Sequence, residues 1–295
     1  MRLRTVLPSA CVAAALCLAG IDAPIVAPVT AQAPTPRPTA PPAPSPAASA
    51  PAVAWPGGAR MALSLSFDDA RESQVTTGLP VFARHEAKVT LYVVPSAVAQ
   101  RVEAWKRAVA AGHEIGSHSV THSCSGNFPF ARAKALEDHS LPRMRAELVE
   151  SNRRIAALLG VTPRTFAYPC GQTFVGRGTA TRSYVPIVAE LYLAGRGWLD
   201  EAANDPAFVD LAQVLGVEMD GKDFAGIRPL LDEAARRGAW LVLAGHDIGV
   251  EGRQVTRVAM LDALLAYAKD PAHGIWLATV GEVSAHIART RAQLK

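Results

Sequence analysis

Short apolar segments alternate with longer segments of helical periodicity from Met61 to residue 292. Residues 61–67 alternate apolar and small polar side chains, and residues 88–94 are rich in β-branched side chains, so both are predicted to be strands. Further strands are predicted at 113–117, 165–168, 240–244 and 275–280, and helices at 98–111, 142–159, 254–268 and 281–292. Strands that alternate with helices in this way pair in parallel through right-handed crossovers.

Two features of this α/β pattern favour a barrel over an open, doubly wound sheet. No glycine-rich phosphate loop follows the first predicted strand. Polar residues gather directly after several strands, where barrel enzymes hold their functional side chains. Residues 57–295 are therefore predicted to form one domain, a distorted or incomplete (β/α) barrel.

The first 56 residues have the composition of a leader and a spacer. Arg2 and Arg4 precede an apolar run of residues 6–19, which is shorter than the roughly 20 residues of a membrane-spanning helix. Residues 1–31 are predicted to be a secretory signal peptide, with cleavage after Ala31. Nine of the 22 prolines lie between Pro34 and Pro56, so residues 32–56 are predicted to be a disordered linker. We expect a secreted or periplasmic protein, or one tethered to the membrane by its N-terminal segment.

The charge of the remaining chain is nearly balanced. Residues 58–295 contain 27 Lys and Arg against 25 Asp and Glu. This balance is unlike the basic stripe that binds nucleic acid, so no nucleic-acid partner is inferred. No stable protein partner is inferred either.

Four polar side chains follow the first and third predicted strands. Asp68 and Asp69 come directly after residues 61–67, and both can face one site only if the chain leaves the sheet there. His118 and His122 are four residues apart, a spacing that brings two imidazoles to one side of a helical turn. Together with Asp69 they would give three metal ligands and leave a coordination position open, as in hydrolytic zinc sites.

A third group of titratable residues lies at the mouth of a late strand. His246 follows the apolar segment 240–245, with Asp247 beside it. A histidine in this position can serve as an acid or a base, although a buried core histidine would fit the same pattern. His85, His139, His273 and His286 are expected to be surface residues.

Two cysteines remain once the leader is removed. Cys124 is two residues beyond His122, and Cys170 follows Pro169, so both are expected near the same site. In an oxidising compartment they could form a disulfide. Buried free thiols are the alternative.

Three motifs resemble the polysaccharide deacetylase family, the NodB-homology group also called carbohydrate esterase family 4. They are Ser-Phe-Asp-Asp-Ala at 66–70, Gly-His-Glu-Ile-Gly-Ser-His-Ser-Val-Thr-His at 112–122, and Leu-Ala-Gly-His-Asp at 243–247. The resemblance implies a distorted barrel of about seven repeats. It also implies that Asp68 is the catalytic base, that Asp69, His118 and His122 hold a metal, and that His246 is the acid that protonates the leaving group.

The sequence departs from the family at its third motif, which reads Phe-Ala-Tyr-Pro-Cys-Gly at 166–171. The arginine that normally holds the base is replaced by Ala167. Arg177 is our preferred candidate for this base-orienting role, and Arg71 is the alternative. The backbone amide of Cys170 would still be available to an oxyanion.

The family's fourth motif has an aspartate that orients the acid histidine. Asp220 and Asp223 resemble this motif only loosely. Asp223 is predicted instead to cap a helix over 224–236. Neither aspartate is assigned a catalytic role.

The resemblance implies hydrolysis of acetyl groups on an N-acetylated polymer or oligomer, such as a chitin-like glycan, peptidoglycan or an exopolysaccharide. Zn²⁺ is the expected metal, with Co²⁺ or Ni²⁺ as alternatives. The same residues would serve an acetylxylan-type O-acetyl esterase or a small-molecule amidohydrolase. A non-catalytic carbohydrate-binding domain with a degenerate site is a further alternative. Trp198 and Tyr184 could line a sugar groove or belong to the core.

Overall fold

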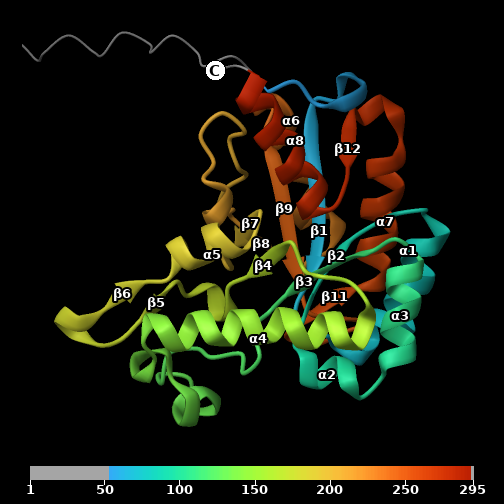
Figure 1. The fold of residues 1–295 in the computed structure, drawn as a ribbon. Coiled ribbons are helices and arrows are strands. Elements are labelled where there is room, and N and C mark those ends of the chain that lie inside the picture. The colour runs from blue at the N-terminus through green and yellow to red at the C-terminus, as the bar shows by residue number, and fades with distance from the viewer. Residues whose placement is uncertain (1–52, 294–295) are drawn as a thin grey trace, which may run out of the picture. The chain divides into compact units, whose positions relative to one another are not determined.

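The computed structural model describes residues 53–293, so the predicted signal peptide and linker residues 32–52 lie outside the described residues (Figure 1). A parallel sheet of eight strands forms the centre of the domain. The strands are β1 (Met61–Phe67), β2 (Thr90–Val93), β3 (Glu114–Ser117), β4 (Thr165–Ala167), β7 (Ala194–Arg196), β8 (Val217–Glu218), β9 (Trp240–Gly245) and β12 (Ile275–Leu277). Their order is β7-β4-β3-β2-β1-β9-β8, with β12 paired to β1.

Strand β1 is the central strand of this sheet. Along one edge, Ala62–Phe67 pairs with Trp240–Gly245 of β9. Along the other edge, β12 pairs with the first half of β1, and β2 pairs with its last two residues. All seven residues of β1 are buried, as expected for a strand covered on both faces.

The sheet curls toward closure but does not complete a barrel. Val214, three residues before β8, forms an isolated parallel bridge with Arg196 of β7, while β8 itself pairs with β9. The two ends of the strand order therefore approach each other. This confirms the predicted α/β fold, a distorted and incomplete barrel.

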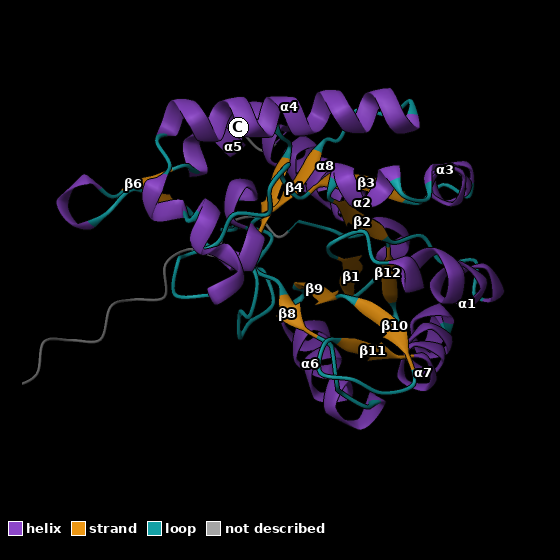
Figure 2. Ribbon diagram, turned by 90° about the horizontal axis from the view of Figure 1, so that it is seen from below, coloured by secondary structure: helices purple, strands orange, loops and turns teal. Residues whose placement is uncertain are grey.

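Helices surround the strands when the domain is seen toward their carboxyl ends (Figure 2). They are α1 (Leu79–Arg84), α2 (Pro95–Ala99), α3 (Val102–Ala110), α4 (Leu141–Leu159), α5 (Val185–Leu191), α6 (Phe224–Arg237), α7 (Val258–Lys269) and α8 (Val280–Gln293). Two small ribbons, β10 (Asp247–Gly249) with β11 (Val255–Arg257) and β5 (Phe174–Val175) with β6 (Arg182–Ser183), lie outside the main sheet.

Most predicted elements are present, with ends shifted by a few residues. The predicted helix 98–111 is instead two helices, because Arg101 has a non-helical backbone (φ −147°, ψ 44°) between α2 and α3. Strands β7 and β8 were not predicted. They are three and two residues long, too short for a periodic pattern to stand out.

The packed domain begins before residue 57. Val53 and Trp55 are buried, and Trp55 Nε1 donates a hydrogen bond to the Gly238 carbonyl at 3.0 Å. The Trp55 ring also packs against Trp276 and His286. The last residues of the predicted linker therefore belong to the domain.

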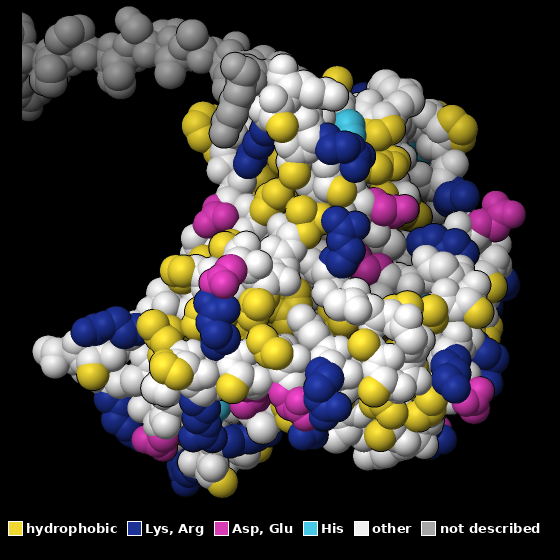
Figure 3. Space-filling model, in the orientation of Figure 1, with side chains coloured by type: hydrophobic (Ala, Val, Ile, Leu, Met, Phe, Trp, Pro, Cys, Tyr) yellow, Lys and Arg dark blue, Asp and Glu magenta, His cyan; other side chains and the backbone are white. Residues whose placement is uncertain are grey.

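Within residues 53–293, no helix combines the length and apolarity needed to cross a membrane. On the face drawn in Figure 3, Lys and Arg side chains are interspersed with Asp and Glu.

Candidate functional site

Asp68 and Asp69 stand where the chain turns sharply out of β1. Asp69 and Ala70 both have left-handed backbones (φ 76° and 54°), a conformation that non-glycine residues adopt rarely. The turn lets the side chains of both aspartates serve one site, although adjacent residues of a strand would point to opposite faces. Asp68 is buried and Asp69 is partly exposed.

His118 and His122 approach the same carboxylate oxygen of Asp69. Asp69 Oδ1 lies 3.5 Å from His118 Nε2 and 3.2 Å from His122 Nε2. The two histidines are not on a helical turn, so that prediction was wrong. They lie in a loop after β3, in which Ser119 and His122 have positive φ, and Ser119 Oγ accepts a hydrogen bond from the His122 amide at 3.0 Å.

These three side chains fit a divalent cation. Their ligand atoms lie within 4.8 Å of one another, and two imidazoles with one carboxylate are a common set at catalytic zinc sites. His118 Nδ1 donates to the Ala167 carbonyl of β4 at 2.8 Å, which directs Nε2 into the site. Burial lowers the pKa of His118 to about 4, so its imidazole is neutral and able to ligate at neutral pH.

Arg71 contacts the other oxygen of the same aspartate. Its guanidinium donates to Asp69 Oδ2 at 2.9 and 3.2 Å and to Asp247 Oδ2 at 2.8 Å. Oδ1 therefore remains for a cation. Burial alone would raise the pKa of Asp69, but its hydrogen bond with His122 and the other neighbouring histidines lower it well below its usual value.

Arg196, the last residue of β7, holds Asp68. Both side chains are buried, and Arg196 Nη2 donates to Asp68 Oδ1. Burial by itself would raise the pKa of Asp68, yet the charge of Arg196, helped by His118 and His246, lowers it. The predicted role of Arg177 was wrong. Its exposed guanidinium instead contacts Asp138 at 2.8 Å, and the alternative, Arg71, contacts Asp69 rather than Asp68.

His246 is held by Asp220, which lies two residues after β8. His246 Nδ1 contacts Asp220 Oδ2 at 2.7 Å, and the His246 amide donates to Asp220 Oδ1 at 3.2 Å. Thr256 Oγ1 donates to that same oxygen at 2.7 Å. Burial would lower the pKa of His246, but its contact with Asp220 and the surrounding carboxylates raise it. Asp223 caps α6 as predicted, accepting from the Gly226 amide.

Close packing beside His246 explains a glycine at the end of β9. A Cβ on Gly245 would lie 2.2 Å from Thr256 Oγ1 and 2.8 Å from Asp220 Oδ1. Any larger residue would therefore displace the two groups that hold the His246–Asp220 pair. Gln74 also ties the two strand ends together, because its Nε2 donates to the carbonyls of Asp68 at 2.6 Å and His246 at 3.0 Å.

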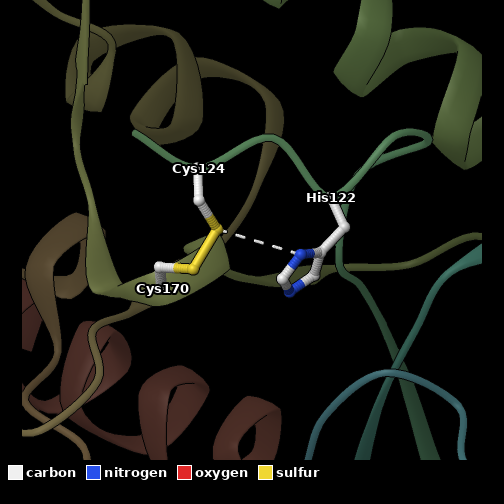
Figure 4. Close-up of side chains that lie close together, drawn as sticks. All are labelled: His122, Cys124 and Cys170. Carbon is white, nitrogen blue, oxygen red and sulfur yellow. Dashed lines mark hydrogen bonds between the residues drawn. A yellow bond between two sulfur atoms is a disulfide. The ribbon is translucent and has the colours of Figure 1, made fainter. Parts of the chain in front are cut away.

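Cys124 and Cys170 form a disulfide beside His122 (Figure 4). Cys124 Sγ lies 3.8 Å from His122 Nδ1. The bridge joins the loop that contains His122 to the loop after β4, where Cys170 has a left-handed backbone (φ 55°). Because both sulfurs are in the bridge, they are not available as thiolate ligands.

The remaining aromatic and histidine residues divide between site and scaffold. Trp198 packs edge-on against His246, with ring centroids 4.8 Å apart. Tyr184 belongs to the core, where its hydroxyl donates to the Gln172 carbonyl. His139 is buried, so its expected surface position was wrong. His85 contacts Asp262, and His273 stacks on Tyr267.

Arg196→Met should destabilise the fold by about 3–5 kcal/mol, because it leaves the buried Asp68 carboxylate without its partner. Asp68→Asn in the same chain should recover part of that loss. Denaturant unfolding of the two single variants and the double variant measures the coupling between the two side chains. Strictly additive effects would mean that the two side chains do not stabilise each other.

Replacing both bridged cysteines with serine should lower the free energy of unfolding by about 4 kcal/mol, the chain-entropy value for a loop of this length. Denaturant unfolding of a chain without residues 1–31 measures the effect. In that chain Cys124 and Cys170 are the only cysteines. A thiol titration of the denatured, unreduced chain serves as the control, and finding two free thiols would refute the bridge.

Comparisons with known proteins support a relationship through the first half of the domain. A family model described as polysaccharide deacetylase matches residues 57–183. The peptidoglycan-N-acetylglucosamine deacetylase PgdA of Listeria monocytogenes is 29% identical over 127 residues, which are 43% of this chain and 24% of that protein. Gellan lyase from a Bacillus species is 30% identical over 148 residues, which are 50% of this chain and 5% of that protein. The chain thus spans about a quarter or less of these relatives.

Among solved structures, the crystal structure of a candidate polysaccharide deacetylase from Mycobacterium smegmatis superposes with a TM-score of 0.59. The alignment covers 84% of this chain and 96% of that chain at 18% identity, so it shows a shared fold. The segment that the family model matches contains both aspartates after β1 and both histidines after β3. Residues 57–183, which make up 43% of the chain, therefore match the polysaccharide deacetylase family model and are similar in sequence to a peptidoglycan deacetylase.

Proposed function

We propose that the chain is a metal-dependent hydrolase that removes acetyl groups from an N-acetylated polysaccharide or oligosaccharide. The main support is the arrangement of Asp68 and His246, two buried groups at neighbouring strand ends that adjoin the Asp69–His118–His122 cluster. The name of the Listeria relative, a peptidoglycan-N-acetylglucosamine deacetylase, favours an amide of an amino sugar over an ester. Such polymers lie outside the cytoplasm, in agreement with the export leader that the sequence predicts.

Asp69, His118 and His122 would hold the cation, for which Zn²⁺ is the first choice and Co²⁺ or Ni²⁺ are the alternatives. A cation bound there would polarise the acetyl carbonyl and make a water molecule more acidic. The protein supplies the proton transfers. Asp68 is the base, because the Arg196 guanidinium opposes the effect of burial and lowers its pKa, so the carboxylate is ionised and can accept a proton from the attacking water.

His246 would donate a proton to the departing amine, which otherwise leaves poorly. Asp220 supports this role because its carboxylate stabilises the protonated imidazole and fixes the ring through Nδ1, so Nε2 is the atom that remains for the substrate. The amide of Cys170 would donate to the oxyanion of the tetrahedral intermediate. One well-placed donor of this kind is typically worth about 3–4 kcal/mol of transition-state stabilisation.

Acetate release is the direct test of this proposal. The metal-loaded protein should release acetate from N-acetylglucosamine oligomers or peptidoglycan, should lose this activity on chelation, and should regain it with Zn²⁺, Co²⁺ or Ni²⁺. Asp68→Asn should reduce turnover by about 100-fold or more, while its metal content stays unchanged because the three ligands are intact. Release from acetylated xylan alone would favour an O-acetyl esterase, and no release from any substrate would favour a binding domain.

The pH dependence tests the role of His246. Because its pKa is raised, the protonated form persists to higher pH, and activity should fall only as the pH rises through that pKa. Asp220→Asn removes the negative charge that contributes to this shift, so the alkaline limb of kcat/KM should move to lower pH. Asp223→Asn is a matched control, because Asp223 caps α6 and is not among the groups that hold His246. An alkaline limb that stays in place in Asp220→Asn would remove His246 as the acid.

A further inference from the structure

Two exposed phenylalanines lie beside the candidate metal ligand His122. The side chains of Phe128 and Phe130 are 41% and 60% exposed, and their ring centroids are 5.6 Å apart. The Phe130 ring centroid lies 6.3 Å from that of the His122 imidazole. Exposed aromatic side chains that lie together often mark an interaction site. Ligand-binding sites typically combine such apolar surface with a few polar groups.

The loop that presents these rings is held firmly. At its start, the Cys124–Cys170 disulfide fixes it to the loop after β4, and the Ser125 amide donates to Gln172 Oε1 at 2.7 Å. At its end, the Glu137 carboxylate accepts hydrogen bonds from Ser125 Oγ and the Gly126 amide. The loop that contains the two phenylalanines therefore loses little conformational entropy when a ligand binds.

Aromatic side chains lie next to two residues of the candidate site, His122 and His246. Phe130 is next to His122, while Trp198 packs against His246. A pyranose ring has flat faces of C–H groups and a rim of hydroxyls, so it can cover an aromatic ring while its edges remain hydrated. A protein partner seated on Phe130 would block access to the candidate metal ligands, which favours the substrate as the occupant.

We propose that Phe128 and Phe130 form a sugar-binding subsite for the residue next to the one that is deacetylated, so the enzyme acts better on oligomers than on small acetyl compounds. This proposal rests on the proposed function and adds the two side chains that would bind a second sugar residue of the substrate. The subsite belongs to the loop 124–138 and takes no part in proton transfer. Its removal should therefore affect binding rather than chemistry.

The test compares Phe128→Ala/Phe130→Ala with the unchanged protein on two substrates. For an N-acetylglucosamine tetramer, kcat/KM should fall about tenfold, mainly through KM, as expected for the loss of aromatic stacking. For the N-acetylglucosamine monomer, which has no neighbouring sugar residue to occupy the subsite, kcat/KM should stay the same. Phe208→Ala is the matched control. Phe208 is 79% exposed and lies near Asn204, which bridges to the first residue of β9, at the opposite end of the sheet.

Equal losses on both substrates, or no loss on the tetramer, would overturn the subsite. Calorimetric binding of the tetramer to Asp68→Asn protein, with and without the two phenylalanines, gives a readout that does not need turnover. Binding that weakens without these rings supports the subsite even if the unchanged protein releases no acetate, in which case only the proposed hydrolysis fails. Binding that is unaffected by their removal refutes the subsite.

Discussion

The buried ion pair between Asp68 and Arg196 joins the end of the central strand β1 to the edge strand β7 of the curled sheet. Asp68 follows the central strand β1, and Arg196 ends β7, which is separated from β1 by three strands in the order of the sheet. The two side chains can meet only because the sheet curls. Since an unpaired charge in the interior is strongly unfavourable, the pair penalises any flattening of the sheet. The same contact keeps the proposed base ionised.

The long, buried strands and the residues at their ends could be predicted from sequence. The seven residues of β1 and the six of β9 give clear patterns, and Asp68, Asp69 and His246 follow them directly. Parallel strands bring such residues to one end of the sheet without further information. The prediction that His118 and His122 lie together is correct, but its reason is not. A loop, rather than a helical turn, brings their rings together.

The side chains that hold Asp68 and His246 could not be predicted in the same way. Arg196 reaches Asp68 across 128 residues of sequence and through the closure of the sheet, and its strand is only three residues long. The prediction of Arg177 depends on its closeness in sequence to the altered motif. Closeness in sequence does not indicate which arginine reaches Asp68 from a distant strand. Asp220 had a weak signal, its loose resemblance to the family's fourth motif, but β8 is too short to be recognised as a strand.

Backbone strain is concentrated in the site and is stabilised by the contacts around it. Asp69, His122 and Cys170 all have positive φ, a conformation that costs non-glycine residues roughly 1–3 kcal/mol each. Each of these residues is held by a different contact. The Arg71 guanidinium donates to the Asp69 carboxylate, the Ser119 hydroxyl accepts from the His122 amide, and Cys170 is bonded to Cys124.

The residues proposed for proton transfer and those proposed for sugar binding lie in different parts of the fold. At the strand ends, buried partners hold the proposed base Asp68 and the proposed acid His246, so the positions of these two side chains depend on the core. The loop that presents Phe128 and Phe130 is attached to that frame at its two ends, through the disulfide and through Glu137. Substitutions between those anchors can change which ligand is bound without disturbing Asp68, Arg196 or the His246–Asp220 pair. Under the proposed function, substrate preference would therefore depend on this loop, while both proton transfers are assigned to residues at strand ends.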